Sequence, residues 1–284
     1  KISDITVSTK EINYAKNLCS VNLYKALQLS IKRVTAYQKK LLPKTINYKD
    51  PSGMKLGCFW KPINSCGLYV PGGKAIYPSS VIMNAIPAKL AGVKRIIITT
   101  PSKDNIIRPE ILLAASLVGI KEIYKVGGAQ AIGAMTYGTD TIKRVDKIVG
   151  PGNAFVAEAK KQVYGEVGID SVAGPSEIMV VADKSCNPEW VAIDLLSQAE
   201  HDEDARVILV TDSKKILNEV NKNLKILLTK ISRKEIAKNS LKNNGISLIV
   251  SNINKAYSII NMIAPEHLEL ITEDNQSLIN KITN

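Results

Sequence analysis

Short apolar runs alternate with amphipathic segments along most of the chain. Runs rich in β-branched residues predict buried strands, and apolar residues at helical spacing follow most of them. The predicted strands cover residues 66–70, 95–99, 122–126, 147–149, 178–182, 207–211, 246–250 and 268–272. The predicted helices cover residues 80–91, 110–117, 129–135, 154–164, 190–198 and 253–263, with two more inside 214–243. Such alternation is typical of parallel sheets covered on both faces, so the pattern predicts an α/β fold.

The first forty residues predict one long helix over 9–41. Ser8 and Glu11 have the spacing of a capping box at its start. Apolar residues then recur at helical spacing, and Pro43 with the turn residues 50–53 ends the pattern.

The two alternating runs predict two Rossmann-like lobes with mainly parallel sheets. We expect residues 67–174 to form one lobe, which is inserted into a second lobe built from residues 1–66 and 175–284. The sequence contains no internal repeat and no low-complexity tract that would suggest a different organisation.

Composition and charge exclude several classes of function. Of the 284 residues 45% are apolar and 23% are charged, which suits a folded core and excludes a disordered chain. The net charge of +12 comes mainly from lysine, because only six of the 38 basic residues are arginine. Arginine is the preferred reader of bases and phosphates, and the surplus charge falls in residues 1–50 and 214–255, where we predict helix surface. We therefore expect no nucleic acid among the partners.

The cellular setting follows from apolar runs and cysteines. No apolar run approaches the length of a membrane span, so no membrane partner is expected. The four cysteines, Cys19, Cys58, Cys66 and Cys186, are scattered without paired spacing. We expect a reduced, cytoplasmic protein.

Four glycine-rich loops are the first candidates for chemistry. They cover residues 67–73, 126–130, 150–153 and 173–177, and the first three directly follow predicted strands. Ligands of parallel sheets bind at the carboxyl ends of strands, and glycine lets the backbone approach them closely. None of the loops is a G-x-G-x-x-G or a P-loop, and any one of them could be a plain tight turn. Four in one lobe, with Tyr69, Gln130 and Asn153 as polar side chains, favour a dinucleotide cleft.

The chain has only two histidines, and each stands beside a polar partner. Gln198 and His201 are three residues apart on a predicted helix, so both could face one metal ion, although a solvated helix end fits equally well. Glu266 and His267 precede a predicted strand and could share acid–base work, although a surface pair beside a turn also fits.

Longer motifs resemble histidinol dehydrogenase. The stretch VGIDSVAGPSEI at 167–178, followed by SQAEH at 197–201, is similar to the signature of that family. The resemblance continues in the family's order through GLYVPGG at 67–73, VGGAQAIGAM at 126–135, VDKIVGPGNAFVAEAK at 145–160 and APEHLEL at 264–270. It covers nearly the whole chain.

The resemblance implies an enzyme and its cofactors. The family has an aldehyde-dehydrogenase-like fold and is a zinc- and NAD-dependent homodimer. It oxidises L-histidinol through L-histidinal to L-histidine, the last steps of histidine biosynthesis. By the resemblance, Tyr69, Gln130 and Asn153 contact NAD.

The resemblance also assigns the catalytic positions. It implies that Gln198 and His201 ligate Zn²⁺ and contact substrate, and that Ser176 contacts substrate. The zinc would orient histidinol rather than activate water. Glu266 and His267 match the acid–base pair: His267 would bind substrate and take the alcohol proton, and Glu266 would activate water for the second oxidation.

Family members are longer than this chain at both ends, so we expect the sequence to be the middle of a longer protein. The family's remaining zinc ligands, an Asp and a His, lie beyond the Glu-His motif, and the His comes from the partner subunit. One alternative is therefore a catalytically inactive relic or partner subunit that lacks the C-terminal zinc ligands. A second alternative is a cysteine-dependent aldehyde dehydrogenase, although no cysteine lies in a recognisable nucleophile motif.

Overall fold

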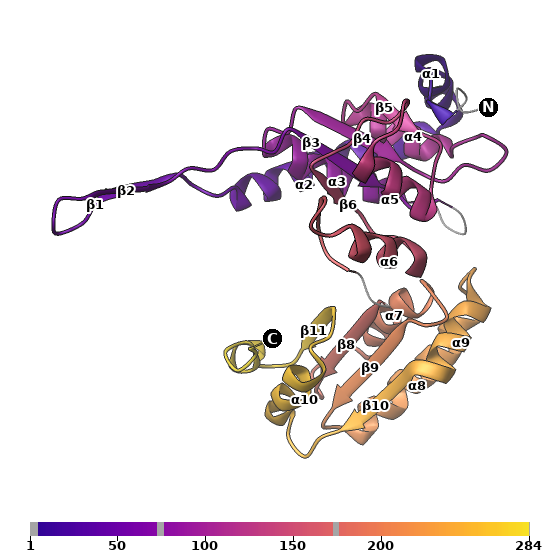
Figure 1. The fold of residues 1–284 in the computed structure, drawn as a ribbon. Coiled ribbons are helices and arrows are strands. Elements are labelled where there is room, and N and C mark those ends of the chain that lie inside the picture. Colours follow the sequence, from indigo (N-terminus) through magenta and orange to yellow (C-terminus); the bar gives the residue numbers. More distant parts are fainter. Residues whose placement is uncertain (1–4, 73–76, 173–175, 284) are drawn as a thin grey trace. The chain divides into compact units, whose positions relative to one another are not determined.

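The computed structural model of the protein describes residues 5–72, 77–172 and 176–283. It confirms the α/β fold, and its contacts divide the chain into two compact units, Lys1–Ala173 and Gly174–Asn284. Each unit has its own parallel sheet (Figure 1). Each unit also has its own hydrophobic cores.

The first unit is built on a five-stranded parallel sheet. In spatial order its strands are β5 (Glu122–Tyr124), β4 (Arg95–Thr99), β3 (Ser65–Tyr69), β6 (Lys147–Val149) and β7 (Gly168–Ile169). The register of the three central strands is seen at Leu68 of β3, which pairs with Ile98 of β4 on one side and with Val149 of β6 on the other. Counted along the chain this order is 3-2-1-4-5, the order found in dinucleotide-binding sheets, with the switch point between β3 and β6.

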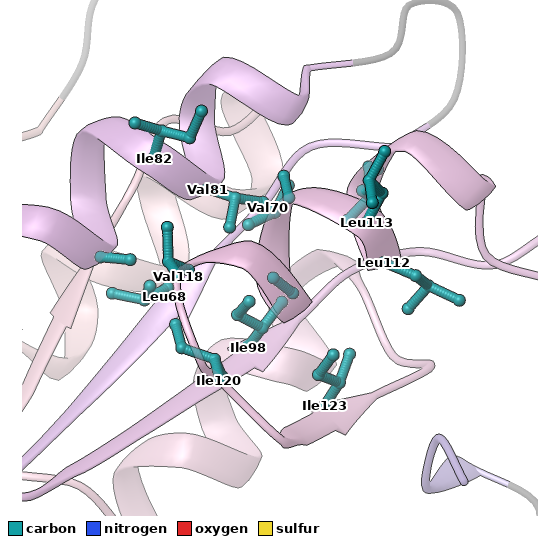
Figure 2. Packing of buried hydrophobic residues seen from close by; sticks show 14 of the residues in the cluster. Leu68, Val70, Val81, Ile82, Ile98, Leu112, Leu113, Val118, Ile120 and Ile123 are labelled. Carbon is teal, nitrogen blue, oxygen red and sulfur yellow. The ribbon is translucent and has the colours of Figure 1, made fainter. Parts of the chain in front are cut away.

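Helices cover both faces of this sheet. One core contains α1 (Thr9–Leu18), α2 (Val21–Gln38), α3 (Pro78–Leu90) and α4 (Pro109–Leu117), and the other contains α5 (Gly128–Tyr137) and α6 (Ala154–Val163). Successive residues of a strand point to opposite faces, so Leu68 and Val70 enter the first core and Tyr69 enters the second. Figure 2 shows Leu68 and Ile98 of the sheet among residues of α3 and α4.

The predicted helix over 9–41 is wrong, because the chain forms two helices there. The capping box of Ser8 and Glu11 is confirmed at the start of α1. Cys19 then adopts an extended conformation, and the Ser20 side chain accepts a hydrogen bond from the Leu23 backbone to start α2. Serine favours such N-caps over helix interiors, and this preference outweighs the continuous apolar stripe.

The N-terminal helices also differ from the expected division into lobes. The sequence placed residues 1–66 with the C-terminal lobe, whereas α1 packs on α4 and α2 packs on α3 inside the first unit. Ile12, Ala15 and Leu27 are buried in the core of the first sheet, and this burial holds the segment there. The contacts divide the chain between Ala173 and Gly174.

A β-hairpin leaves the first unit as an extended arm (Figure 1). Its antiparallel strands are β1 (Ile46–Lys49) and β2 (Lys55–Cys58), which follow the short 3-10 helix η2 (Lys39–Leu41). All eight strand residues are exposed. The sequence pattern did not predict this hairpin.

The second unit has a four-stranded parallel sheet in the order β10 (Gly245–Ile249), β9 (Arg206–Thr211), β8 (Glu177–Ala182) and β11 (His267–Ile271). One face packs against α7 (Pro188–Ala199), α8 (Lys214–Leu228) and α9 (Lys234–Asn244). The opposite face packs against η3 (Ile253–Lys255), α10 (Ala256–Ile263) and α11 (Asn275–Ile279). None of the helices in the described part of the chain has the length and apolar character that a bilayer span needs.

Candidate functional site

At the carboxyl edge of the first sheet, the switch point lies where the neighbouring strands β3 and β6 end. Tyr69 ends β3, and Gly150 follows β6 with a φ of +117°. A Cβ atom on Gly150 would lie 2.1 Å from the Tyr69 carbonyl oxygen, so only glycine fits there. Ligands of such sheets bind in the crevice outside this point.

Tyr69 links the end of β3 to the start of α5 at this edge. Its side chain is buried, and its hydroxyl accepts a hydrogen bond from the Gly128 backbone N–H at 3.1 Å. Burial raises the pKa of the Tyr69 hydroxyl, while the bond from Gly128 opposes that shift. The neutral hydroxyl therefore fixes the end of β3 against the start of α5.

Gln130 and Asn153 stand at the starts of two helices on the same edge. Asn153 caps α6, because its Oδ1 accepts a hydrogen bond from the Val156 backbone at 3.1 Å. Gln130 is exposed in the first turn of α5, whose N-cap Gly127 offers no side-chain hydrogen bond. A helix start without a side-chain cap favours an anion such as a phosphate.

A buried hydroxyl without a partner lies at this edge. Thr100, directly after β4, is fully buried, and its Oγ1 has no hydrogen-bond partner among residues 5–72, 77–172 and 176–283. A Cβ on Gly72 would lie 3.2 Å from that oxygen, so the glycine leaves the space beside it open. Buried polar atoms are rarely left unpaired, so the glycine cradle and this hydroxyl fit a polar ligand such as a dinucleotide.

Lys160 and Asp170 hold the Gly150 loop, a role that the sequence pattern did not predict. The Lys160 ammonium is buried, forms an ion pair with Asp170 and donates to the Gly150 carbonyl at 3.1 Å. Asp170 in turn accepts a hydrogen bond from the Gly150 N–H at 2.7 Å. Lys160 follows Val156 by four residues on the buried side of α6, and a lysine in an apolar stripe is the signal that could have identified it.

The second group of predicted residues gathers at the amino edge of the second sheet. His267 is the first residue of β11 and pairs with Ile178, the second residue of β8. Ser176 directly precedes β8, and its carbonyl accepts a hydrogen bond from the Arg206 backbone at 2.9 Å. This edge is opposite to the one where parallel sheets usually bind ligands.

Glu266 and His267 form an open pair at this edge. The His267 Nε2 lies 3.9 Å from the Glu266 Oε2, and both side chains are more than half exposed. The same Glu266 oxygen accepts a hydrogen bond from the Glu177 backbone N–H at 3.3 Å. The structure therefore brings Ser176, Glu266 and His267 to one place, with both side chains of the pair accessible to a substrate.

Helix α7 brings Gln198 toward His267. The helix connects the carboxyl end of β8 to the amino end of β9, so it runs antiparallel to the strands. Asp194 of α7 interacts with Glu269 of β11. Gln198 lies one helical turn after Asp194, and His267 lies two strand residues before Glu269. Each of these two steps covers roughly 6 Å in the direction of the amino edge. Gln198 is buried, and His201 follows it at the exposed end of the helix.

The contact between Glu269 and Asp194 is itself unusual. Burial raises the pKa of Glu269, and the charge and hydrogen bond of Asp194 raise it further. Two carboxyl groups so close share a proton more readily than they both ionise. This contact fastens α7 to β11 directly behind His267.

The described residues supply only part of a zinc site. In residues 5–72, 77–172 and 176–283 no three His, Cys, Asp or Glu side chains cluster as metal ligands. Gln198 and His201 share one end of α7, whereas zinc in proteins is usually held by three or four protein ligands. These two donors alone do not make a complete zinc site.

Burial disfavours the thiolate form of three of the four cysteines. Burial raises the pKa of Cys66 to about 11, and burial also raises the pKa values of Cys19 and Cys186. Cys58 lies on the hairpin arm. A reactive cysteine needs a lowered pKa, so the structure gives no support to a cysteine-dependent aldehyde dehydrogenase.

The predicted residues 73 and 173–175 lie outside the described residues. The remaining fold and site define a class of protein: an α/β protein with two parallel sheets, a glycine-rich carboxyl edge on one and an exposed Glu–His pair on the other.

Comparisons with known proteins identify the family. The family model of histidinol dehydrogenase matches residues 1–284. Histidinol dehydrogenase 1 from a Nostoc species is 51% identical over 264 residues, which are 93% of this chain and 61% of that relative. The crystal structure of histidinol dehydrogenase from Elizabethkingia anophelis is 42% identical, with a TM-score of 0.96 over 99% of this chain and 65% of that one. The chain belongs to the histidinol dehydrogenase family.

Two further points qualify this membership. The chain spans less than two thirds of the length of these relatives. A propionaldehyde dehydrogenase from Rhodopseudomonas palustris, 13% identical, has a TM-score of 0.52 over 99% of this chain and 84% of its own. This second likeness concerns the fold alone, and it confirms the aldehyde-dehydrogenase-like architecture.

Proposed function

We propose that the protein is an NAD-dependent dehydrogenase that oxidises L-histidinol through L-histidinal to L-histidine, in the last steps of histidine biosynthesis. The observation that carries the proposal is the exposed Glu266–His267 pair at the amino edge of the second sheet, in a chain of the histidinol dehydrogenase family. The glycine-rich carboxyl edge of the first sheet supports a nucleotide cofactor in the same chain.

NAD supplies the hydride acceptor when it is bound. Tyr69, Gln130 and Asn153 stand at the carboxyl edge that would hold it, and the start of α5 would receive a phosphate. The Gly150 loop is held on both its N–H and its carbonyl, so little ordering is needed on binding.

His267 and Glu266 divide the proton transfers of the two oxidations. His267 takes the proton of the substrate alcohol at Nε2, since a neutral imidazole accepts protons near neutral pH. Glu266 then takes a proton from a water molecule that attacks the aldehyde, and its hydrogen bond from the Glu177 N–H keeps the carboxylate in place. Ser176, beside Glu177, contacts the substrate.

Zinc and the oligomeric state belong to the same proposal. Gln198 and His201 would supply two of the ligands of a Zn²⁺, and the bound metal would orient the substrate. The working protein is a cytoplasmic homodimer whose ligand is a small molecule, with neither nucleic acid nor membrane as a partner.

NADH formation tests this proposal. Purified protein with histidinol and NAD should produce two NADH per histidine, and a chelator should slow the reaction while added zinc restores it. Absence of any histidinol-dependent NADH, together with absence of zinc binding, would favour the alternative of a non-catalytic partner subunit.

A further inference from the structure

Glu177, the first residue of β8, contacts Glu266 through its backbone and a cation through its side chain. Its N–H donates to the Glu266 carboxylate at 3.3 Å, and its own carboxylate forms an ion pair with Arg206 at 2.7 Å. Arg206 is the first residue of β9 and the strand neighbour of Glu177. One residue therefore joins the acid of the proposed acid–base pair to a guanidinium that the proposed chemistry does not use.

Arg206 contacts the start of β8 at two points. Its backbone N–H donates to the Ser176 carbonyl at 2.9 Å, and its guanidinium reaches the Glu177 carboxylate. The Glu177 side chain is only 19% exposed, so water screens this ion pair less than an ordinary surface pair. Arg206 thus fixes both Glu177 and the residue before it.

The alternation of side chains places these charges on one face of the second sheet. The core on the α10 side of that sheet contains one residue from each of three strands, Met179, Ile208 and Leu268. Residues two positions apart on a strand point to the same face, so Glu177, Arg206 and Glu266 share the α10 side. His267 points to the opposite face, which α7 covers. The two members of the Glu–His pair therefore have different surroundings.

The charges on this face show what Arg206 contributes. The hydrogen bond from the Glu177 backbone keeps two acidic residues, Glu177 and Glu266, as neighbours. Two ionised carboxylates held so close repel each other. The loop directly before Arg206, residues 202–204, adds three more acidic residues. The guanidinium neutralises Glu177, which leaves the Glu266 carboxylate available to take a proton.

We propose that Arg206 is a positioning residue for Glu266 and acts through Glu177. It cancels the charge of the Glu177 carboxylate, and it holds the residue whose N–H orients the Glu266 carboxylate. This inference rests on the proposed function, because it assigns Arg206 to the second oxidation, in which Glu266 takes a proton from water. The alcohol oxidation uses His267 on the other face of the sheet, so it does not depend on Arg206.

The two oxidations test the proposal separately. In the full-length protein with NAD, Arg206→Met should lower kcat for L-histidinal by about tenfold and leave its KM within about twofold, because the lost interaction serves the transition state. The first NADH formed from L-histidinol in a single turnover should appear at the normal rate. Equal slowing of both oxidations would overturn the proposal.

Further variants at the ion pair separate charge from packing. Arg206→Lys keeps the cation and should retain about half of the L-histidinal activity or more. Glu177→Gln added to Arg206→Met removes the unpaired carboxylate but keeps the backbone N–H, so it should restore most of the loss. If the ion pair served packing alone, the second substitution would bring no recovery, and that result would overturn the proposal.

Arg95→Met is the matched control. Arg95 begins β4, at the amino edge of the first sheet, and forms an ion pair with Glu122 at 2.6 Å. Its loss should lower the stability of the first unit in urea and leave L-histidinal oxidation unchanged under folding conditions. An equal loss of L-histidinal oxidation in this control would mean that any broken ion pair slows the enzyme, and the proposal would fall.

Hydrogen exchange gives a readout that does not depend on activity. Arg206→Met should speed exchange of the Glu177 amide by about tenfold, because its acceptor on Glu266 is held less firmly, while the Val180 amide in the middle of β8 stays slow. Absence of NADH from either substrate in the unchanged protein would remove the proposed function itself. Normal NADH formation, with neither L-histidinal oxidation nor Glu177 exchange responding to Arg206→Met, would overturn the positioning role alone.

Discussion

The two candidate edges of this protein are built in opposite ways. At the carboxyl edge of the first sheet, Tyr69 is buried and Gly150 is held on both sides of its peptide by Lys160 and Asp170. At the amino edge of the second sheet, Glu266 and His267 are more than half exposed and lie 3.9 Å apart. The first edge is fixed in advance, whereas the second leaves its reactive side chains free for a substrate.

The difference fits the roles proposed for the two edges. A cofactor site that is ordered before binding loses little conformational entropy when the ligand arrives. An acid–base pair must instead reach the substrate, and its hydrogen bonds often tighten only in the complex. The rigid parts behind the second edge are the contact between Asp194 and Glu269 and the sheet itself.

The largest effect should come from a substitution in the exposed Glu266–His267 pair at the amino edge of the second sheet. In the full-length protein His267→Asn should lower the alcohol oxidation rate by roughly 10³-fold, because a positioned general base contributes about that much. Zinc content should remain normal, as measured by elemental analysis.

The other histidine is the matched control for this variant. His201→Asn should lower zinc content as well as activity. Loss of zinc from His267→Asn would instead place that side chain on the metal and contradict the proposed role.

Loss of the Lys160–Asp170 ion pair at the carboxyl edge of the first sheet should lower the stability of the first unit. Lys160→Met leaves Asp170 without its buried partner, so the free energy of unfolding of the first unit should fall by about 3 kcal/mol. The Asp170 side chain is 33% exposed, so the expected loss lies at the low end of the range for broken buried ion pairs.

A double variant separates charge from packing. Lys160→Met with Asp170→Leu should recover part of the stability in urea denaturation, while the affinity for NAD stays low because the Gly150 loop is no longer held. An additive loss in the double variant would show that the two residues do not act on each other.

Two glycines with positive φ, one on each side of α6, form a matched pair. Gly150→Ala should lower the free energy of unfolding by about 2 kcal/mol or more, since strain at positive φ is joined by a clash with the Tyr69 carbonyl. Gly165 has a similar φ of +109° but no heavy atom within 4 Å, so Gly165→Ala should cost only about 1 kcal/mol. Equal effects in urea denaturation would mean that the close approach to Tyr69 is unimportant.

The smallest expected effect concerns Glu269 of β11, which lies two residues after His267 on the same strand. The folded pKa of Glu269 lies above its ordinary value, so stability is lost as the pH rises through the interval between the two values. Glu269→Gln removes this loss and should make the second unit more stable at neutral pH, by less than about 1 kcal/mol. The gain should vanish at pH values below the ordinary pKa of the carboxyl. A gain that persists in acid would point to packing rather than charge.

The sequence predicted the strands and helices that have a buried face. The β-branched run of β4 and the strand β6 lie where periodicity placed them, since both are central strands of a buried sheet. The hairpin of β1 and β2 escaped prediction because its residues are all exposed, so no alternation against a core marks it. The break between α1 and α2 was missed because one serine cap outweighed a continuous apolar stripe.

The candidate site was predictable only in part, for a similar reason. Glycine loops reveal the carboxyl edge because close backbone approach requires a particular residue type. The amino edge could not be found from strand ends, since ligands of parallel sheets usually bind at the opposite edge. The residues alone left Glu266 and His267 open between acid–base work and a plain surface pair, and only the family resemblance favoured the first. Lys160 and Asp170 are ten residues apart and meet only through the fold of α6 and β7.

Hydrogen exchange in the presence of NAD tests the central claim most directly. The claim is that the cofactor binds at the carboxyl edge of the first sheet, while the second sheet uses its amino edge for chemistry. NAD should slow amide exchange in residues 127–132 and 150–156 and leave residues 183–187 and 272–276, at the carboxyl edge of the second sheet, unchanged. Slowed exchange at 183–187 and 272–276, with no change around Gly128 and Gly150, would contradict the account.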